Sequence, residues 1–351
     1  MIRSILRIAG LFAVLLVIGA LWLFSSVQSH LDAPVDLHQQ NLDKQGQLIW
    51  TVPKGSNLGQ INRRLFAREI LSHPKIMSAY ATLTDRTSIQ AGSYWINAED
   101  SARTLLDKFN RGEVIRYQIT FPEGWSFKQW LGHLAIQPQF AEVTDSTVSQ
   151  LLAAADIDVA HPEGWFFPDT YTYTDTDSVV DILRQAHSNM KAALDDAWQG
   201  RELGLPYKSA YEALIMASII EKETGLAEER DAIAGVFVRR LNLGMRLQTD
   251  PTVIYGMGDS YQGNIRRSDL KRRTPYNTYR IKGLPPTPIA MPSAAAINAA
   301  LHPLSGSSLY FVARGDGGHY FSDSLEEHLL AVKQYQIRNR VQNYQSAPPT
   351  D

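Results

Sequence analysis

The sequence has 351 residues, of which 44% are hydrophobic and 20% are charged, and its formal net charge at pH 7 is -2. This composition is that of a folded chain, and the near-neutral charge gives no indication of a nucleic-acid partner. The sequence contains no cysteine, which excludes disulfides, thiolate catalysis and cysteine–zinc sites. The length predicts an anchor followed by two domains.

The first predicted element is an apolar helix over residues 8–27, preceded by Arg3 and Arg7 and followed by no charge until Asp32. At 1.5 Å per residue this helix is about 30 Å long, which matches the core of a bilayer. The positive-inside rule then places the N-terminus in the cytoplasm. A cleaved signal peptide is the alternative, but no small-x-small cleavage site follows the apolar run. We therefore expect residues 1–27 to form a cytoplasmic N-terminus and a single transmembrane anchor.

A polar segment without a sustained period follows the anchor. Residues 28–46 have the composition of a flexible tether. Residues 47–135 then contain two similar stretches, 51–61 and 120–130, each with a strand, a Pro-x-Gly turn and an apolar helix. The first stretch resembles the LysM motif, which binds glycans that contain N-acetylglucosamine. We therefore predict a small LysM-like α+β module, with a role in packing alone as the alternative.

The rest of the chain predicts a second and larger domain. Residues 136–160 are small and polar and indicate a helical connector. Helices then alternate with short strands over residues 161–345, which is an α+β pattern. The tail at 346–351 has a disordered composition.

The helix predicted over residues 210–224 contains the main candidates for acid–base chemistry. It is apolar nearly all round, which indicates burial, and it ends in Glu221-Lys222-Glu223. Burial and the negative end of the helix dipole both raise the pKa of a carboxylate at this end, as a general acid requires. The two glutamates lie about 200° apart around the helix, so they do not share one pocket. On spacing alone a structural role is favoured, in which both end the helix and pair with Lys222 or Arg230.

Three other segments combine residue types that suit a carbohydrate site. Residues 163–171 place aromatic rings, which stack on sugars, beside carboxylates, which accept hydrogen bonds from sugar hydroxyls. Residues 246–256 are a polar loop that leads into an apolar run, and prolines fix a loop over residues 276–293. Each segment taken singly is also compatible with an ordinary turn.

Other chemistries find little support. The sequence has no HExxH, GxSxG, Walker A or GxGxxG motif. Residues 72–75 match the SxxK string of penicillin-binding enzymes, but Pro74 interrupts the required helix and no KTG follows. A basic run over residues 266–273 is either a solvated surface or a contact for an anionic polymer or acidic peptide.

Four segments together closely resemble the YceG-like (MltG-type) endolytic murein transglycosylases: residues 163–170, 217–224, 247–256 and 276–286. The resemblance implies a lytic transglycosylase that cuts the bond between N-acetylmuramic acid and N-acetylglucosamine inside nascent peptidoglycan strands, leaving a 1,6-anhydro end. The family's catalytic glutamate falls on Glu221, which then protonates the glycosidic oxygen and takes the proton of the muramic C6 hydroxyl. That internal nucleophile removes the need for a second carboxylate. The alternative is a non-catalytic peptidoglycan-binding scaffold for cell-wall synthases.

The resemblance also implies the setting of the enzyme. It indicates the bacterial inner membrane, a periplasmic catalytic domain of the YceG-like type over residues 161–345, penicillin-binding synthases as partners, and neither metal nor cofactor. The residues that we expect to bind the glycan are Glu163, Trp165, Phe167, Asp169, Ser218, Glu223, Gln248, Asp250, Tyr255, Asn277, Thr278 and Tyr279.

Overall fold

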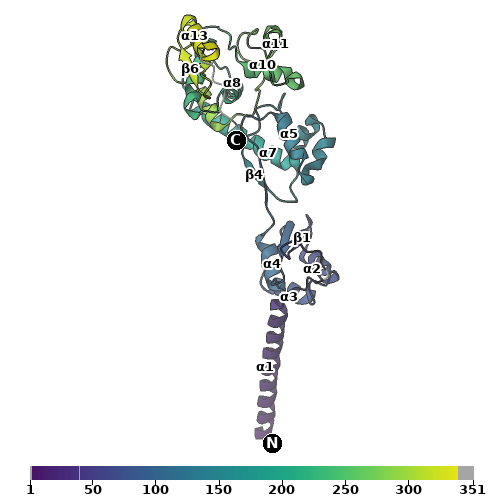
Figure 1. Ribbon diagram of the computed structural model, residues 1–351. Coiled ribbons are helices and arrows are strands. Elements are labelled where there is room, and N and C mark those ends of the chain that lie inside the picture. The colour runs from purple at the N-terminus through teal and green to yellow at the C-terminus, as the bar shows by residue number, and fades with distance from the viewer. Residues whose placement is uncertain (1, 39, 339–351) are drawn as a thin grey trace. The chain divides into compact units, whose positions relative to one another are not determined.

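The computed structural model describes residues 2–38 and 40–338 and mixes helices with short strands, which confirms the predicted α+β class (Figure 1). The predicted tail at 346–351 lies outside the described residues. The chain forms two compact units. The first contains the residues up to Gln118 together with Thr172–Asp177, and the second contains Ile119–Tyr171 and the residues from Ser178 onward.

The first element is the long apolar helix α1, Ile2–Asp32. Its residues from Gly10 to Asp32 are long and apolar enough to cross a membrane. The side chains from Leu11 to Phe24 that are large and apolar are each more than half exposed. The helix is thus consistent with a single-pass membrane anchor, although it ends five residues beyond the predicted end at Val27.

The first part of the segment expected to be a flexible tether, up to Leu37, is packed instead. Leu31 is fully buried, and Val35 and Leu37 also lie in the apolar core of the first unit. The main-chain N–H of Val35 donates to the carbonyl of Asp100 at 2.7 Å. Each of these three side chains contributes on the order of 1.5–3 kcal/mol on burial, so the part of the segment up to Leu37 is held on the first unit. The prediction of a tether over residues 28–46 rested on average composition, which does not reveal a few apolar side chains that become buried.

In the first unit, helices pack on a two-stranded antiparallel sheet. Strand β1 (Leu48–Val52) pairs with β2 (Gly92–Ile96) so that Trp50 lies opposite Tyr94. Helices α2 (Leu58–Ala67), α3 (Pro74–Leu83) and α4 (Ala102–Arg111) contribute the rest of the core. Asn57 caps α2 through its side chain, which accepts from the N–H of Gln60.

The boundary of this unit differs from the predicted module over residues 47–135. The unit ends at Gln118, so the second of the two similar stretches, residues 120–130, belongs to the other unit. There Phe121 stacks on Trp130 with ring centroids 3.7 Å apart, and Trp130 also contacts Phe166. Similar local patterns fold into different units because long-range packing decides which core a helix joins.

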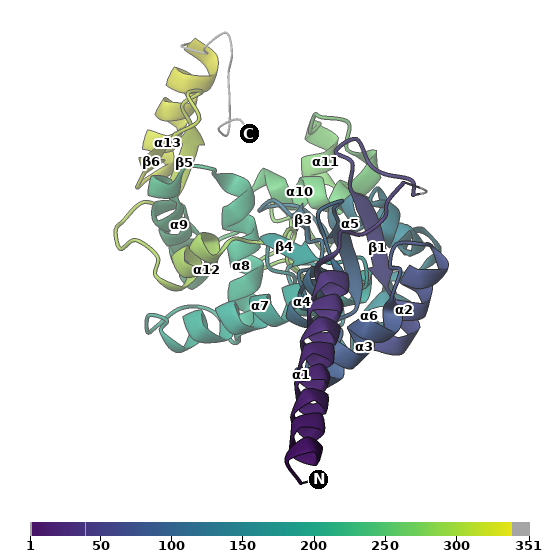
Figure 2. The ribbon, with the colours of Figure 1, turned by 90° about the horizontal axis from the view of Figure 1, so that it is seen from below.

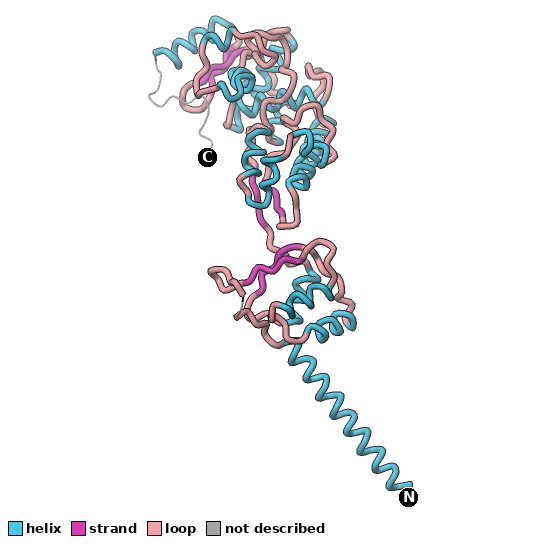
Figure 3. The backbone as a smooth tube through the Cα atoms, turned by 90° about the vertical axis from the view of Figure 1, so that its right-hand side faces the viewer, coloured by secondary structure: helices cyan, strands magenta, loops and turns pink. Residues whose placement is uncertain are grey.

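The second unit is mainly helical, as the tube drawing in Figure 3 shows. The chain enters and leaves it through strands β3 (Tyr117–Thr120) and β4 (Thr170–Tyr173), which pair with each other. Its C-terminal part contains a second strand pair, in which Phe311 lies opposite Phe321. The remaining elements are α5 (Phe127–Ala135), η1 (Pro138–Asp145), α6 (Val148–Ala154), α7 (Val179–Gln199), α8 (Ala210–Glu223), η2 (Ala227–Glu229), α9 (Arg230–Asn242), α10 (Asp250–Met257), η3 (Gly258–Ser260), α11 (Arg267–Lys271), α12 (Ala294–Leu301), β5 (Tyr310–Ala313), β6 (His319–Ser322), α13 (Leu325–Val332) and η4 (Lys333–Arg338).

Helix α8 is the centre of the second unit. Every residue from Ala213 to Ile220 is buried, which confirms the burial predicted for this helix. It contacts α7, α9, α10 and α12, and Figure 2 shows it beside α12 and α9. A helix enclosed in this way has a fixed position, so the polar residues at its C-terminal end are held on a rigid support.

Candidate active site

Glu221 lies in the last turn of α8, and the start of α12 holds its side chain. The Oε2 atom of Glu221 accepts hydrogen bonds from the main-chain N–H of Ser293 at 3.0 Å and from its hydroxyl at 2.5 Å. Ser293 is the N-cap of α12, and its Oγ also accepts from the N–H of Ala296 at 3.1 Å. Both donors bond to one carboxylate oxygen. Among the described residues, none donates to Oε1 of Glu221, and the residue is partly exposed.

A tight turn at Glu123-Gly124 lies beside Glu221 and Lys222. The ammonium of Lys222 donates to the carbonyl of Gly124 at 3.0 Å. The N–H of Gly124 donates to the carbonyl of Met291, and the N–H of Met291 donates to the carbonyl of Trp125, both at 2.8 Å. Gly124 has a φ of 73°, and a β-carbon on it would lie 3.7 Å from Cγ of Glu221. The turn therefore connects the end of α8 to the loop that precedes α12.

The turn brings a second carboxylate, Glu123, into the electrostatic field of Glu221. Burial and the charge of Glu221 raise the pKa of Glu123 above its ordinary value, and Arg230 opposes the rise. The sequence reasoning did not select Glu123. A signal was present, because the string Pro-Glu-Gly-Trp occurs both at 122–125 and at 162–165. Sequence analysis predicts a glycan-binding glutamate only at the second copy, because that copy lies in the aromatic segment over residues 163–171.

Glu163, predicted to bind glycan, is 3% exposed, and its carboxylate forms hydrogen bonds within the protein. Its Oε1 accepts from the N–H of Phe127 at 2.9 Å, and its Oε2 accepts from the hydroxyl of Tyr255 at 3.0 Å. Burial raises the pKa of Glu163 to about 7. Two of the predicted site residues, Glu163 and Tyr255, are thus brought together, and the carboxylate satisfies an N–H in the first turn of α5.

Ser218 and the aromatic candidates are also engaged within the fold. The hydroxyl of Ser218, which is fully buried, donates to the carbonyl of Ile215 and accepts from the N–H of Ile289. Trp165 stacks on Tyr211 with ring centroids 5.6 Å apart, and Phe167 packs against the core around α8. The rings of Trp165 and Phe167 remain partly exposed, whereas Ser218 offers nothing to a ligand.

Glu223 belongs to a separate polar cluster on the next part of the helix surface. Its Oε2 accepts from the hydroxyl of Thr249 at 2.7 Å. Burial is the main reason why the pKa of Glu223 rises to about 7, with Asp250 adding to the rise. The expectation of a raised carboxylate pKa at this end of α8 is thus confirmed for Glu223. The hydroxyl of Tyr279 donates to Oδ1 of Asp250 at 2.7 Å, which joins both residues to the cluster.

The other predicted residues divide into supporting and exposed groups. Thr278 is buried, and its hydroxyl accepts from the N–H of Thr249 and contacts the hydroxyl of Thr252. The amide of Asn277 donates to the carbonyls of Asp269, Leu270 and Arg272, which fixes the loop after α11. By contrast, the side chains of Gln248, Asp250 and Asp169 are exposed. Gln248 has a φ of 56°, a left-handed conformation that is costly for a residue with a side chain and that Glu69, Asp85 and Asp156 also adopt.

The end of α8 therefore carries two glutamates in different settings: the start of α12 holds Glu221, and the loop at 247–250 holds Glu223. This arrangement, and the sequence around it, defines a member of a known family: the YceG-like family model matches residues 50–334, and the chain belongs to that family.

Individual relatives agree with this assignment. An endolytic murein transglycosylase from Bacillus subtilis (strain 168) is 31% identical over 302 residues, which cover 81% of this chain and 83% of that protein. An endolytic murein transglycosylase from Streptococcus pneumoniae (strain R6) is 29% identical over 318 residues, but the match spans only 56% of that longer protein. The crystal structure of a yceG-like protein from Listeria monocytogenes is 29% identical and aligns with a TM-score of 0.51 over 81% of this chain and 98% of that chain.

Proposed function

We propose that this protein is a membrane-anchored endolytic lytic transglycosylase of peptidoglycan, with Glu221 as its general acid and base. Two relatives with this activity in their names support the reaction class. The observation that carries the role of Glu221 is its geometry: Ser293 holds one carboxylate oxygen through two hydrogen bonds and leaves the other open. An acid–base group needs this combination of fixed position and one accessible oxygen.

The proposed reaction needs one carboxyl group. Protonated Glu221 donates to the oxygen that links N-acetylmuramic acid to N-acetylglucosamine, and the bond from that oxygen to C1 of the muramic sugar breaks. The muramic C6 hydroxyl then bonds to C1, and the Glu221 carboxylate takes the hydroxyl proton. The products are a 1,6-anhydro end and a free hydroxyl on the released sugar, and Glu221 returns to its protonated form. Holding the C6 hydroxyl and C1 within one ring system supplies the proximity that an external water lacks.

The surroundings of Glu221 support this use. Lys222, which carries the nearest positive charge along the chain, is directed to the carbonyl of Gly124 and so is held beside the site. Exposed Gln248 and Asp250 offer hydrogen-bonding groups for sugar hydroxyls. We propose Trp165 and Phe167 as the rings that contact sugar, because both are partly exposed.

The first unit contains the LysM-like stretch, and we propose that it contacts the same glycan. Trp50 does not supply a stacking ring, because it is 1% exposed and Arg64 and Arg68 lie over it at 5.1 and 5.5 Å. We further propose that the N-terminus is cytoplasmic, that the two units are periplasmic at the inner membrane, and that penicillin-binding synthases are partners. Arg3 and Arg7, which precede the apolar run of α1, support this orientation.

The test is mass spectrometry of glycan strands treated with the full-length protein in detergent. We expect products with anhydro ends from the wild type, none from Glu221→Gln, and unchanged activity from Glu202→Gln, which alters an exposed glutamate of the same unit. Products with ordinary reducing ends would instead indicate a hydrolase that uses Asp250 or Asp169. If Glu221→Gln cuts as fast as the wild type while its melting temperature is unchanged, the role of Glu221 is wrong. If no form cuts and the strands are still bound, the protein is a non-catalytic scaffold.

A further inference from the structure

The end of α1 and one face of α3 form an open apolar groove in the first unit. Its volume is about 490 Å³. The apolar side chains that line it come from the two helices: Phe24, Val27 and Leu31 from α1, and Ile76, Ala79 and Leu83 from α3. Leu83 is 86% exposed and Phe24 is 64% exposed, so much of this surface has no cover within the described chain. An apolar surface of this kind on a folded unit indicates an interaction site.

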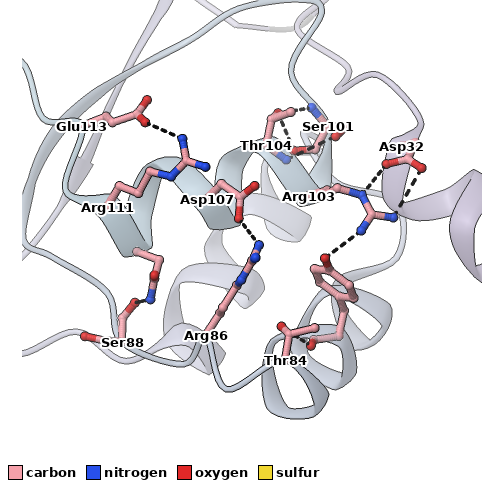
Figure 4. A network of polar contacts seen from close by, with 12 residues as sticks. Asp32, Thr84, Arg86, Ser88, Ser101, Arg103, Thr104, Asp107, Arg111 and Glu113 are labelled. Carbon is pink, nitrogen blue, oxygen red and sulfur yellow. Dashed lines mark hydrogen bonds and ion pairs between the residues drawn. The ribbon is translucent and has the colours of Figure 1, made fainter.

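The two walls of the groove are held at a fixed distance. Helix α1 continues without a break to Asp32, and its residue Leu31 is fully buried in the core of the unit. Arg103 of α4 joins both walls, as Figure 4 shows in part: its Nε donates to Asp32 at 2.6 Å and its Nη1 donates to the hydroxyl of Tyr80 at 2.7 Å. Its Nη2 also donates to Oε1 of Gln28. Contacts within the first unit therefore hold the two helices that form the groove in place.

The position of the groove along α1 indicates what covers it. The large apolar side chains of α1 from Leu11 to Phe24 are exposed by more than half, and the helix from Gly10 to Asp32 is long and apolar enough to cross a bilayer. Phe24 and Val27 form the last turns of that apolar stretch and are also a wall of the groove. The groove is thus continuous with the exposed apolar surface of α1, at the end of the apolar stretch.

The polar groups around the groove fit the same level of a membrane. Lys75 and Tyr80 of α3 line its edge. Lysine is a residue that places an apolar stem in the boundary region and directs its ammonium toward water or lipid phosphate, while the hydroxyl of Tyr80 is held by Arg103. A second copy of the chain would not need a cation at this edge, whereas a phospholipid supplies both an acyl chain and a phosphate.

We propose that α3 docks into the interface of the membrane that α1 spans, with phospholipid acyl chains in the groove and Lys75 beside their phosphates. The proposal depends on the proposed membrane-spanning role of α1. Its consequence is that the first unit has a fixed orientation on the membrane, because it is attached through a helix and an adjoining face instead of a flexible linker.

The absence of cysteine allows a direct test with the full chain. Leu83→Cys, Ile49→Cys and Val17→Cys are labelled singly with the fluorophore NBD and reconstituted into phosphatidylcholine–phosphatidylglycerol vesicles. Ile49 is the matched control, because it is an apolar residue that is 47% exposed but lies on β1. Val17 lies within α1 and reports whether that helix is inserted. Quenching is measured with iodide on both sides of the bilayer and with lipids that have a spin label high on the acyl chain.

We expect the label at position 83 to lose most of its fluorescence to the spin-labelled lipid and little to iodide, and the label at position 49 to show the reverse. If positions 83 and 49 are quenched equally by iodide while position 17 is protected, the docking is refuted and the anchor stands. If position 17 is also quenched by iodide, the anchor itself is refuted. If position 83 is protected from both quenchers only at high protein-to-lipid ratio, a second copy covers the groove and the lipid proposal is wrong.

Discussion

Ser293→Ala removes the hydroxyl that links Glu221 to the start of α12. In the wild type this hydroxyl donates to Oε2 of Glu221 at 2.5 Å and accepts from the N–H of Ala296 at 3.1 Å. A hydrogen bond to a charged group contributes about 1.5–3 kcal/mol, and about 1.4 kcal/mol corresponds to a factor of ten in rate. We therefore expect kcat to fall by roughly 10- to 100-fold. The fall stops short of complete loss because the main-chain N–H of residue 293 still donates to Glu221.

The same substitution removes a helix cap, so stability has to be separated from activity. Loss of a serine N-cap costs about 1 kcal/mol, which lowers Tm by about 2–4 °C for a unit of this size. Ser324→Ala is the matched control, since Ser324 caps α13 through the N–H of Glu327 and does not contact Glu221. Ser293→Thr, which keeps a hydroxyl, should restore most of the activity.

The assay is the rate of formation of anhydro-ended products at saturating glycan, with Tm measured on the same preparations. The reasoning fails if Ser293→Ala cuts at the wild-type rate. It also fails if Ser324→Ala loses as much activity as Ser293→Ala, because the effect would then follow stability alone.

Two further predictions concern the buried support of the site. Burial raises the pKa of Glu163 from 4.5 to about 7. The protonated side chain therefore contributes its full stabilisation below about pH 4.5, and this stabilisation is lost as the pH rises through 7. The stabilisation lost is roughly 3 kcal/mol, at 1.36 kcal/mol per pH unit. Glu163→Gln should therefore lose less stability than the wild type between pH 5 and pH 8 in urea unfolding, and equal losses would contradict the assignment. Gly164→Ala should cost roughly 2–4 kcal/mol, because Gly164 has a φ of 84° and a β-carbon there would lie 2.5 Å from Pro288. Gly204→Ala, at a φ of 78° with open space around it, should cost only about 1 kcal/mol in the same measurement.

Local patterns in the sequence predicted the elements that carry the site. Helix α8 was predicted from its uninterrupted apolar run, because a helix that is apolar all round has to be buried whatever packs on it. The apolar helices predicted after the Pro-x-Gly turns at 51–61 and 120–130 also form, as α2 and α5, with Asn57 and Ser126 as their N-caps. Such features depend on residues that are close together in the sequence, so they can be predicted from it.

Features that depend on distant segments were not predictable in this way. Ser293 and Glu221 are 72 positions apart, and nothing local indicates that the cap of α12 faces the end of α8. Glu163 was chosen for binding because carboxylates suit sugars, but the fold directs it to the N–H of Phe127. The chemistry of a side chain limits its possible roles, and the packing of distant segments selects among them.

The path of the chain beyond α1 changes what anchoring implies for the substrate. A flexible tether over residues 28–46 would have given a typical reach of roughly 25 Å. However, Leu31, Val35 and Leu37 are buried in the first unit. Helix α1 therefore leads directly into a folded unit, with no flexible linker between them. Releasing the protein from the membrane should therefore change where it cuts. The released form should begin at Gln28, because a start beyond Leu31 removes a core residue. With a cleavable signal peptide in place of residues 1–27, we expect anhydro ends to spread from new strands to mature ones, measured by pulse labelling of the cell wall. An unchanged ratio of cuts in labelled and unlabelled strands, at equal activity of the two purified forms, would show that attachment does not select the substrate.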